Sequence, residues 1–393
     1  MLRNSPLLIH ISDDQLGFMG YLAIDSFVRD RAFGGIRVKV GNNTPHSDYE
    51  IEVMALAREM TLKFGFHEIP LGGAKLIIIL PPSQSRQQRD HYFEVFGRHL
   101  GPLLRKGVLN TGQDMGMSER DLYFFVQGTG LGKAQGIPSE HVKSDSGKFT
   151  AIGILQTFKN FCHHRQWDLR QLGCAIEGFG SVGSQLAECL NSENVRVIGI
   201  STLKGALYNK EGLDVQELSR LQLQHGDRLV EYYPNAQKLA KEELFMVETD
   251  VLFPCGGLFS IHDGNAAKIQ AKAVITGANC SAKEDIIAKI EERNKFFIPG
   301  FVANAGSVLK SHLVKARGPK TNEELVLQVK DLFDQRMESL FSEAQSNGRS
   351  LYAQAKAIAL ANQNRLNKQK DNLTKKVGRK FLSLIKVGRS CVY

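Results

Sequence analysis

Two lysines and an aspartate in the first third of the 393-residue chain stand in apolar or glycine-rich surroundings: Lys63 in MTLK, Lys75 in PLGGAK and Asp114 in TGQDMG. A lysine held in a cleft loses stabilisation of its charge, so its pKa falls towards neutrality and it can act as a general base. Lys75 fits this role best, because it stands between a Gly-Gly turn and an aliphatic run. A second lysine nearby would hold a substrate carboxylate, and Asp114 would accept a proton from a substrate ammonium. Three ordinary surface residues are the alternative.

A glycine motif in the middle of the chain has the pattern of a dinucleotide site. The apolar segment 174–176 leads directly into EGFGSVG (177–183), and the helical pattern SQLAECL follows. In such a turn the glycines permit a tight bend, a close approach to the pyrophosphate and close packing of helix on strand, and the helix N-terminus supplies N–H groups to the phosphates. A glycine-rich packing turn is the alternative. The residues expected to bind the cofactor here are Gly178, Gly180, Ser181, Val182 and Gly183.

The end of the next strand indicates which dinucleotide is bound. A free ribose 2′-hydroxyl is normally held by an acidic residue about 20 residues beyond the glycines. The segment here is GISTLKG (199–205), which contains no carboxylate. Ser201 and Thr202 can hydrogen-bond a 2′-phosphate and Lys204 can pair with it, so this segment favours NADP over NAD. The alternative is an exposed lysine that contacts nothing.

The hydrophobic pattern predicts the elements that position these residues. Residues 36–40 indicate a strand. A helix that Ser47 or Asp48 can cap carries MTLK near its end, because apolar positions recur there every three to four residues. The run 76–80 is continuously aliphatic, which is typical of a strand buried on both faces. The polar segment around Asp114 indicates a loop or strand end, where functional residues concentrate.

A compositional break at SDSGK (144–148) marks the predicted domain boundary. Beyond it, short apolar segments alternate with helical patterns up to residue 298, which predicts a parallel sheet built of βαβ units. We therefore predict an α/β protein with two domains and C-terminal helices. These are an N-terminal α/β substrate-binding and oligomerisation domain at 1–147, a Rossmann-type dinucleotide-binding domain at 148–320, and helices at 321–393 that partly pack back on the first domain.

The composition narrows the possible function classes. With 42% hydrophobic and 23% charged residues, the chain has the make-up of a folded protein. Its longest aliphatic run is five residues, against the about 20 that a membrane-spanning helix needs, and its start lacks the pattern of a secretory signal. We therefore expect a cytoplasmic protein. The six cysteines are scattered without a CxxC pair, so no metal site is expected.

The net charge of +9 is concentrated at the C-terminus. From Arg365 onward, nine basic residues face a single acid, Asp371, and apolar residues recur among them at near-helical spacing. Such a tail could lie on RNA, an acidic partner or an anionic membrane surface, but a solvated helix is the plainer interpretation. No membrane or nucleic-acid partner is predicted, although the tail leaves nucleic acid open.

Eight motifs, in order, resemble the glutamate/leucine/phenylalanine/valine dehydrogenase family over about residues 30–310. The motifs are GGIR (34–37), MTLK (60–63), PLGGAK (70–75), QDMG (113–116), FTAIG (149–153), EGFGSVG (177–183), DVLFPC (250–255) and NAG (304–306). The resemblance implies NAD(P)-dependent oxidative deamination of an L-amino acid to a 2-oxo acid and ammonia, or the reverse, in an interdomain cleft of a homo-oligomer.

The resemblance also implies a role for each matching residue. Lys63 would bind the substrate α-carboxylate, Lys75 would activate the water that attacks the imino acid, and Asp114 would carry a proton to and from the substrate nitrogen. The residues implied to lie beside the nicotinamide are Thr150, Asn279 and Asn304.

Departures from the family pattern bear on the substrate. Glutamate-specific members usually carry a lysine just before the Gly-Gly of the first motif, where it meets the γ-carboxylate; here that residue is Phe33. This resembles the leucine/phenylalanine type, although Ser311 matches glutamate enzymes and Lys310 beside it is unusual. The residues expected to shape the substrate pocket are Phe33, Gly35, Gly112, Val308 and Ser311.

The leading hypothesis is therefore an amino-acid dehydrogenase for apolar or aromatic side chains. A glutamate dehydrogenase is the alternative within the family. A catalytically silent, dinucleotide-binding regulatory protein that uses the basic tail is the alternative of another class.

Overall fold

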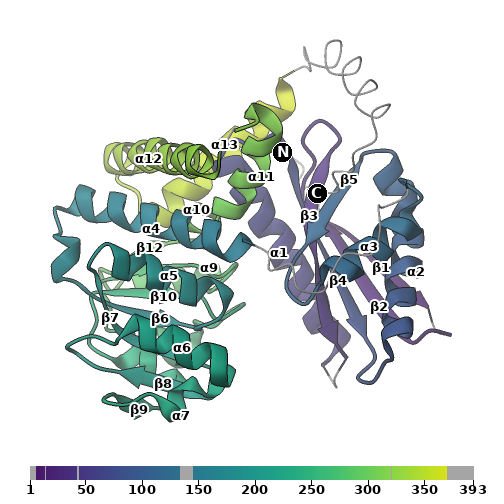
Figure 1. Ribbon diagram of the computed structural model, residues 1–393. Coiled ribbons are helices and arrows are strands. Elements are labelled where there is room, and N and C mark those ends of the chain that lie inside the picture. Colours follow the sequence, from purple (N-terminus) through teal and green to yellow (C-terminus); the bar gives the residue numbers. More distant parts are fainter. Residues whose placement is uncertain (1–5, 14, 42–43, 133–144, 320, 370–393) are drawn as a thin grey trace. The chain divides into compact units, whose positions relative to one another are not determined.

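The protein is described by a computed structural model that covers residues 6–13, 15–41, 44–132, 145–319 and 321–369 (Figure 1). The chain falls into two compact units. Unit 1 takes the residues up to Lys143 and those from Ala359 onward, and unit 2 is Ser144–Ile358. The division falls four residues before the boundary suggested by the sequence, and most of the C-terminal helical segment belongs to unit 2.

Unit 1 is built on a five-stranded mixed sheet with the order β1-β2-β4-β3-β5. The strands are β1 (Leu7–Asp13), β2 (Phe18–Ile24), β3 (Ala32–Val40), β4 (Gly72–Leu80) and β5 (Leu109–Gln113). β1 and β2 pair antiparallel, as do β2 and β4, whereas β3 pairs parallel to both β4 and β5. β4, the strand that carries Lys75, is buried along its whole length.

Helices cover both faces of this sheet. They are α1 (His46–Phe66), α2 (Arg86–Arg105) and α3 (Glu119–Thr129). Because side chains alternate along a strand, Leu76 and Ile78 of β4 join the core formed with α2 and α3, whereas Ile77 and Ile79 join the core formed with α1. Lys75 has the parity of the second set, so it lies on the α1 face.

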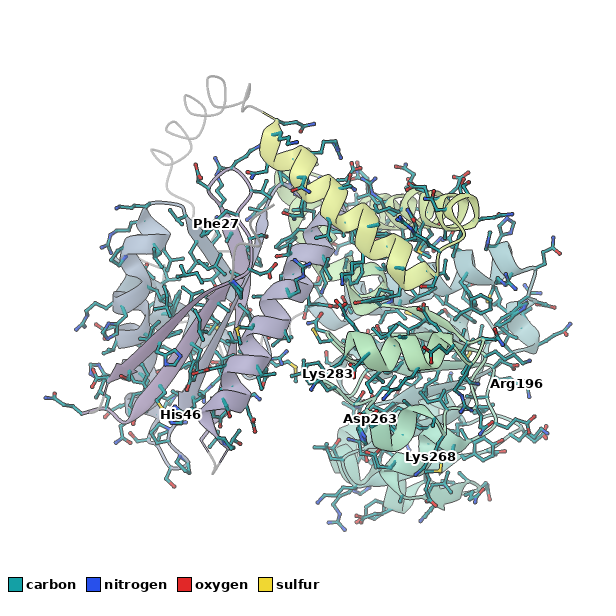
Figure 2. All side chains as sticks on the ribbon, turned by 180° about the vertical axis from the view of Figure 1, so that it is seen from behind. Phe27, His46, Arg196, Asp263, Lys268 and Lys283 are labelled. Carbon is teal, nitrogen blue, oxygen red and sulfur yellow. The ribbon has the colours of Figure 1, made fainter. Side chains whose placement is uncertain are left out.

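The N-cap of helix α1 lies two or three residues before the predicted cap at Ser47 or Asp48. Its N-cap is Pro45, which has no side-chain oxygen to cap the helix, and Asp48 lies in the first turn, where its charge favours the helix dipole. The first residue, His46, is labelled in Figure 2; its Nδ1 lies 2.9 Å from the hydroxyl of Tyr21 in β2. The helix is thereby attached to the sheet at its N-terminal end.

Unit 2 is built on a seven-stranded sheet with the order β12-β11-β10-β6-β7-β8-β9. The strands are β6 (Gly173–Glu177), β7 (Arg196–Thr202), β8 (Gly205–Tyr208), β9 (Gln237–Leu239), β10 (Val251–Pro254), β11 (Ala273–Ile275) and β12 (Phe296–Ile298). The five strands from β12 to β7 are parallel, and β8 and β9 add to the edge antiparallel. The predicted α/β class, with a sheet rich in parallel strands, is confirmed.

The helices of unit 2 connect these strands and extend beyond them. They are α4 (Ser146–Arg165), α5 (Ser181–Ser192), α6 (Val215–His225), α7 (Leu229–Tyr232), α8 (Asp263–Ala266), α9 (Glu284–Glu291), α10 (Gly300–Ala303), α11 (Gly306–Arg317) and α12 (Asn322–Asn347). No helix of the described residues is long and apolar enough to cross a membrane.

The last described helix, α13 (Leu351–Lys368), starts in unit 2 and ends in unit 1. Gln363 of this helix donates from Nε2 to the carbonyl oxygens of Thr61, at 3.2 Å, and Leu71, at 3.0 Å. A Cβ on Gly65 would stand 2.1 Å from the carbonyl oxygen of Ala359, so α1 and α13 pack backbone to backbone. Beyond Gln369 the basic tail lies outside the described residues.

Candidate active site

Lys75 and Asp114 form an ion pair in unit 1. The Nζ atom of Lys75, on β4, donates to Oδ2 of Asp114, and the Lys75 side chain is 4% exposed. Asp114 follows β5, and its backbone N–H donates to the carbonyl oxygen of Ile36 at 3.1 Å. Parallel pairing of β3 with both β4 and β5 thus brings together two residues that are 39 positions apart.

Glycines of β3 leave the space in which this pair forms. A Cβ on Gly34 would stand 2.0 Å from the carbonyl oxygen of Ala74, so only glycine allows the two strands to approach here. A Cβ on Gly35 would stand 3.0 Å from the Cβ of Asp114, and Gly35 lies opposite Gly112 in the β3/β5 register. Gly35 therefore lies against Asp114, with Gly112 beside it on the neighbouring strand.

The pKa values of the two groups move in the same direction. Burial lowers the pKa of the Lys75 ammonium; the charge of Asp114 opposes this effect and that of Arg37 adds to it. Burial alone would raise the pKa of Asp114, but the cations Lys75 and Arg37 outweigh it and hold this pKa well below its usual range. The site therefore holds an ionised carboxylate beside an amine that gives up its proton more readily than an exposed lysine does.

A further part of this cluster was missed by the sequence-based prediction. Arg37 of β3 donates from Nε to Oδ2 of Asp114 at 3.1 Å and from Nη1 to Oε1 of Glu52 at 3.0 Å. The second oxygen of Glu52 accepts from Lys39. Arg37 and Lys39 are two residues apart on a strand, hence on one face, and two cations facing a helix would have indicated a buried acid on that helix.

Lys63 and Phe33 lie on the same side of the unit 1 sheet. Lys63 is in the last turn of α1 and is 4% exposed, which is the burial expected of a carboxylate-binding lysine. Phe33 has the parity of Arg37 on β3 and is partly buried; its ring lies edge-to-face on Phe64 of α1, with centroids 6.0 Å apart. The aromatic ring thus occupies a place on the α1 face close to that helix.

The glycine motif in unit 2 has the geometry that a pyrophosphate needs. Gly178 has a φ of +88°, which favours glycine, and a Cβ on Gly183 would stand 2.0 Å from the Gly178 carbonyl oxygen. A Cβ on Gly180 would meet nothing within 4 Å, so the backbone there is open. Helix α5 begins at Ser181, which is exposed, with Val182 partly buried behind it. This is the backbone geometry of a glycine turn that leads into a helix N-terminus, which a pyrophosphate requires.

The predicted roles of Ser201 and Thr202 need correction. Ser201 is fully buried and its Oγ accepts from the N–H of Gly178 at 3.1 Å. Thr202 is 3% exposed, and its Oγ1 donates to the carbonyl oxygen of Asp227 at 2.7 Å. Both hydroxyls are buried, and each ties the strand end to a neighbouring segment; Lys204 alone of the three residues is exposed.

The turn to which Thr202 hydrogen-bonds brings charged residues to the end of β7. Arg228 donates from Nε and Nη2 to Oε2 of Glu231, at 2.9 and 2.8 Å. The Arg228 guanidinium, with Lys204 and Lys238, holds the pKa of Glu231 below its usual value. The structure thus places cations and a carboxylate beside a segment whose sequence contains only Lys204.

Two of the three residues implied to lie by the nicotinamide are brought together. Asn304 donates from Nδ2 to the carbonyl oxygen of Gly277, at 3.1 Å, and to Oδ1 of Asn279, at 3.0 Å. Its own Oδ1 is buried and accepts no hydrogen bond. Thr150 lies in the first turns of α4, where its Oγ1 donates to the carbonyl oxygen of Ser146 at 2.8 Å. A buried acceptor without a donor suits a ligand amide.

The remaining predicted pocket residues lie on α11 in unit 2. Val308 is partly buried and Ser311 is exposed, with its Oγ donating to the carbonyl oxygen of Ser307 at 3.1 Å. Lys310 between them donates to both carboxylate oxygens of Asp145, and its ammonium lies 4.9 Å from the centre of the Phe149 ring. Phe33, Gly35 and Gly112 belong to unit 1, and these α11 residues to unit 2.

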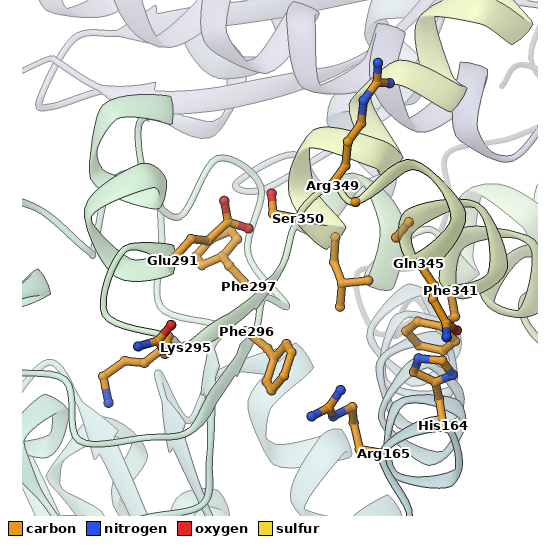
Figure 3. A pocket seen from close by; sticks show the side chains of 14 residues that line it. His164, Arg165, Glu291, Lys295, Phe296, Phe297, Phe341, Gln345, Arg349 and Ser350 are labelled. Carbon is orange, nitrogen blue, oxygen red and sulfur yellow. The ribbon is translucent and has the colours of Figure 1, made fainter.

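A separate hollow in unit 2 is lined by residues from α4, α9, β12, α12 and the start of α13 (Figure 3). Phe296, the first residue of β12, places it at the amino end of the parallel strands, whereas the glycine motif follows the carboxyl end of β6. Two of its cations are engaged within the protein: Lys295 donates to the carbonyl oxygen of Ala271 at 2.9 Å, and Arg165 lies 4.5 Å from the Phe296 ring centre. The hollow and the glycine motif thus lie at opposite ends of the parallel strands.

Comparison with protein families matches both units. Residues 8–130 match the model described as Glu/Leu/Phe/Val dehydrogenase, dimerisation domain, and residues 143–370 match Glutamate/Leucine/Phenylalanine/Valine dehydrogenase. The chain belongs to the Glu/Leu/Phe/Val dehydrogenase family. It is an NAD(P)-dependent amino-acid dehydrogenase of that family, so the oxidoreductase class predicted from the sequence is confirmed.

Relatives of this dehydrogenase include a glutamate dehydrogenase of Thermotoga maritima, 30% identical over 83% of this chain and 79% of the relative. The NAD-specific glutamate dehydrogenase of Staphylococcus aureus is 29% identical over 75% and 71%. Among solved structures, hetero-hexameric glutamate dehydrogenase from Thermus thermophilus (Leu bound form) has a TM-score of 0.76 at 23% identity, over 93% of this chain and 88% of that one. This last likeness supports the two-domain fold.

Proposed function

We propose that this dehydrogenase oxidises the α-amino group of an L-amino acid at Lys75 and Asp114, releasing ammonia and the 2-oxo acid, and catalyses the reverse reaction. The observation that carries the proposal is the buried Lys75–Asp114 pair, which Gly35 on β3 allows to form by leaving space for the Asp114 side chain. A lysine with a lowered pKa next to an ionised carboxylate can hold and move protons at neutral pH.

Each residue has a role in this proposal. When bound on the glycine motif, the nicotinamide cofactor accepts or supplies the hydride. Lys63, buried in the last turn of α1, binds the substrate α-carboxylate. Asp114 takes a proton from the substrate nitrogen and returns it, and neutral Lys75 removes a proton from the water that attacks the imino carbon. Asn304, with a buried acceptor, orients the carboxamide of the cofactor.

For the substrate side chain, we propose an apolar or aromatic group. Phe33 supplies an aromatic ring where a γ-carboxylate would need a cation, and burying an unpaired carboxylate against a ring is strongly unfavourable. Lys310 does not supply that cation, because both oxygens of Asp145 engage it. L-Glutamate is the second candidate, because the curated relatives reported above are glutamate dehydrogenases.

For the cofactor, we propose NADP ahead of NAD. Lys204 is exposed at the end of β7 and supplies a cation for a 2′-phosphate, and Arg228, on the turn to which Thr202 hydrogen-bonds, is a second cation nearby that Glu231 engages. Glu231 competes for Arg228 and is the residue that would favour NAD, in line with the NAD-specific relative. We also propose a homo-oligomer formed through unit 1, since residues 8–130 match a dimerisation domain and the Thermus relative is a hexamer.

A panel of L-amino acids, each assayed with NAD⁺ and NADP⁺ for the absorbance of the reduced cofactor, tests the function. Turnover of at least one amino acid by the wild type, and its loss in Lys75→Ala, is the expected result. If a folded wild-type protein that binds cofactor turns over no amino acid in either direction, the protein is instead a silent dinucleotide-binding protein.

A further inference from the structure

We propose that Arg37 and Glu52 are positioning residues that set the pH at which the enzyme becomes active. Arg37 and Lys75 both donate to the carboxylate of Asp114, and Glu52 holds Arg37 from its other side. This inference rests on the proposed role of Lys75. Neither Arg37 nor Glu52 is needed to touch the substrate: both act through Asp114 and, through it, on the lysine.

The geometry is a chain of shared contacts on the α1 face of the unit 1 sheet. Oδ2 of Asp114 accepts from two cations, the Lys75 ammonium and Nε of Arg37. The other side of the same guanidinium donates to Glu52, and the side chains of Arg37 and Glu52 are 10% and 9% exposed. The planar guanidinium fixes the directions of its donors, so its position settles the orientation of the carboxylate that Lys75 meets.

The charges acting on Lys75 come from three elements. Asp114 follows β5 and favours the ammonium form, Arg37 on β3 opposes it, and Glu52 on α1 favours it. Helix α1 also carries Lys63, and Lys39 on β3 pairs with Glu52. Because these groups are buried or half-buried, solvent screens their interactions weakly. Arg37 and Glu52 must therefore shift the titration of Lys75 in opposite directions.

Removal of the two charges is expected to shift the titration of Lys75 in opposite directions, and this distinguishes a positioning role from a merely structural one. Without the charge of Arg37, Lys75 is the cation that pairs with Asp114, and Arg37 no longer repels the Lys75 ammonium. The lysine therefore keeps its proton to higher pH. Without the charge of Glu52, Lys75 loses an attraction and Arg37 turns more fully to Asp114, so the lysine loses its proton at lower pH. A structural role predicts lower stability and lower turnover in both variants, with no shift along the pH axis.

The first test is the pH profile of kcat/KM for oxidative deamination in Arg37→Met, Arg37→Lys and Glu52→Gln. We expect the acid limb to move up by about one pH unit in Arg37→Met and down in Glu52→Gln, with Arg37→Lys close to the wild type. The matched control is Arg89→Met, which breaks a partly buried pair with Asp121 between α2 and α3, on the other face of the sheet. Its acid limb should not move. Shifts in the same direction, or none in either variant, overturn the proposal.

A second measurement needs no turnover. Cyanate carbamylates neutral amines, so the rate at which the Lys75 peptide gains the adduct, followed by mass spectrometry against pH, reports the protonation of this lysine directly. The curve of carbamylation rate against pH should move up in Arg37→Met and down in Glu52→Gln. If wild type deaminates no amino acid while the carbamylation curves shift as described, the proposed function fails and the positioning role stands; if wild type is active and the curves coincide, the reverse holds. Should Arg37→Met not fold, Glu52→Gln and Arg37→Lys decide the result.

Discussion

Lys310 donates to both carboxylate oxygens of Asp145, one residue before helix α4 begins. The ammonium also lies over the Phe149 ring of that helix. Its charge is therefore balanced within unit 2, and the sequence alone, which shows only a lysine beside Ser311, leaves that open. The structure thus accounts for the charge of Lys310 by contacts within unit 2.

Neutral amino acids should outperform L-glutamate. We expect higher kcat/KM for L-leucine or L-phenylalanine than for L-glutamate, and Phe33→Lys should move the ratio towards glutamate by about tenfold or more, since it supplies the missing counter-charge. Lys310→Ala, the matched loss of a cation, should leave the ratio unchanged. A wild type that prefers glutamate, and loses this preference in Lys310→Ala, would show an acidic-substrate site built on α11.

Lys75→Ala should lower kcat by about 10²–10⁴-fold, the usual contribution of general acid–base catalysis, while folding and cofactor binding persist. Lys63→Ala should mainly raise KM, because Lys63 binds the carboxylate and does not move protons. Steady-state kinetics together with a thermal melt check both expectations. Wild-type turnover by Lys75→Ala would contradict the catalytic role of this lysine.

The pH profile of the wild type follows from the burial of Lys75. Oxidative deamination needs the neutral amine, and burial lowers the pKa of this lysine from the ordinary 10.5. Activity should therefore be lost as the pH falls through the lowered value, with the inflection in kcat/KM below 10.5. An inflection at or above the pKa of an exposed lysine would show that the pKa of the Lys75 amine is not lowered.

NADPH should be preferred to NADH, or used equally well. Lys204→Asp and Arg228→Ala should each shift the ratio of kcat/KM values towards NADH, whereas Glu231→Gln should shift it towards NADPH by freeing Arg228. Lys268→Asp is the control, an exposed lysine on unit 2 that is labelled in Figure 2. If the wild type is at least about tenfold better with NADH and Lys204→Asp changes nothing, the cations have no role in cofactor choice.

Glu177, fully buried at the end of β6, should make stability depend on pH. Burial raises the pKa of its carboxyl above 4.5, so the folded state binds the proton more tightly than the unfolded chain does. Stability is therefore lost as the pH rises through that range, and Glu177→Gln should raise Tm at neutral pH but not at about pH 4. Glu338→Gln, on the exposed side of α12, is the control. A lower Tm at neutral pH would mean that the ionised carboxylate is needed.

Much of the fold was predictable because its central strands are apolar runs. The apolar segment 174–176 lies within β6, and residue 298, where the predicted alternation ends, is the last residue of β12, since burial on both faces leaves no polar interruption in such strands. β1 and β9 were not predicted. Their residues are largely exposed or half-buried, as edge strands are, and β9 is three residues long, so neither shows a clear apolar pattern.

The site was predictable where a side chain contrasts with its neighbours. Lys75 stands out in a strand of isoleucines and leucines. Glu52 lies on a helix with many charged residues, and only its pairing with Arg37 in the structure identifies it as part of the site. Ser201 and Thr202 show the opposite error: their types suit a phosphate, yet strand alternation and turn geometry bury them. Which polar group faces a ligand is decided by tertiary packing, which composition does not encode.

The hydrogen bonds from α13 to α1 have a consequence for the order of events during synthesis. Gln363 and its partner Thr61 are 302 residues apart, so α1 leaves the ribosome long before the segment that covers it. At about 5–20 residues per second, the wait is on the order of tens of seconds. Unit 1 is thus synthesised first but is completed only when α13 has been made. Until then, the surface of α1 at Gly65 is open to chaperones or to wrong partners.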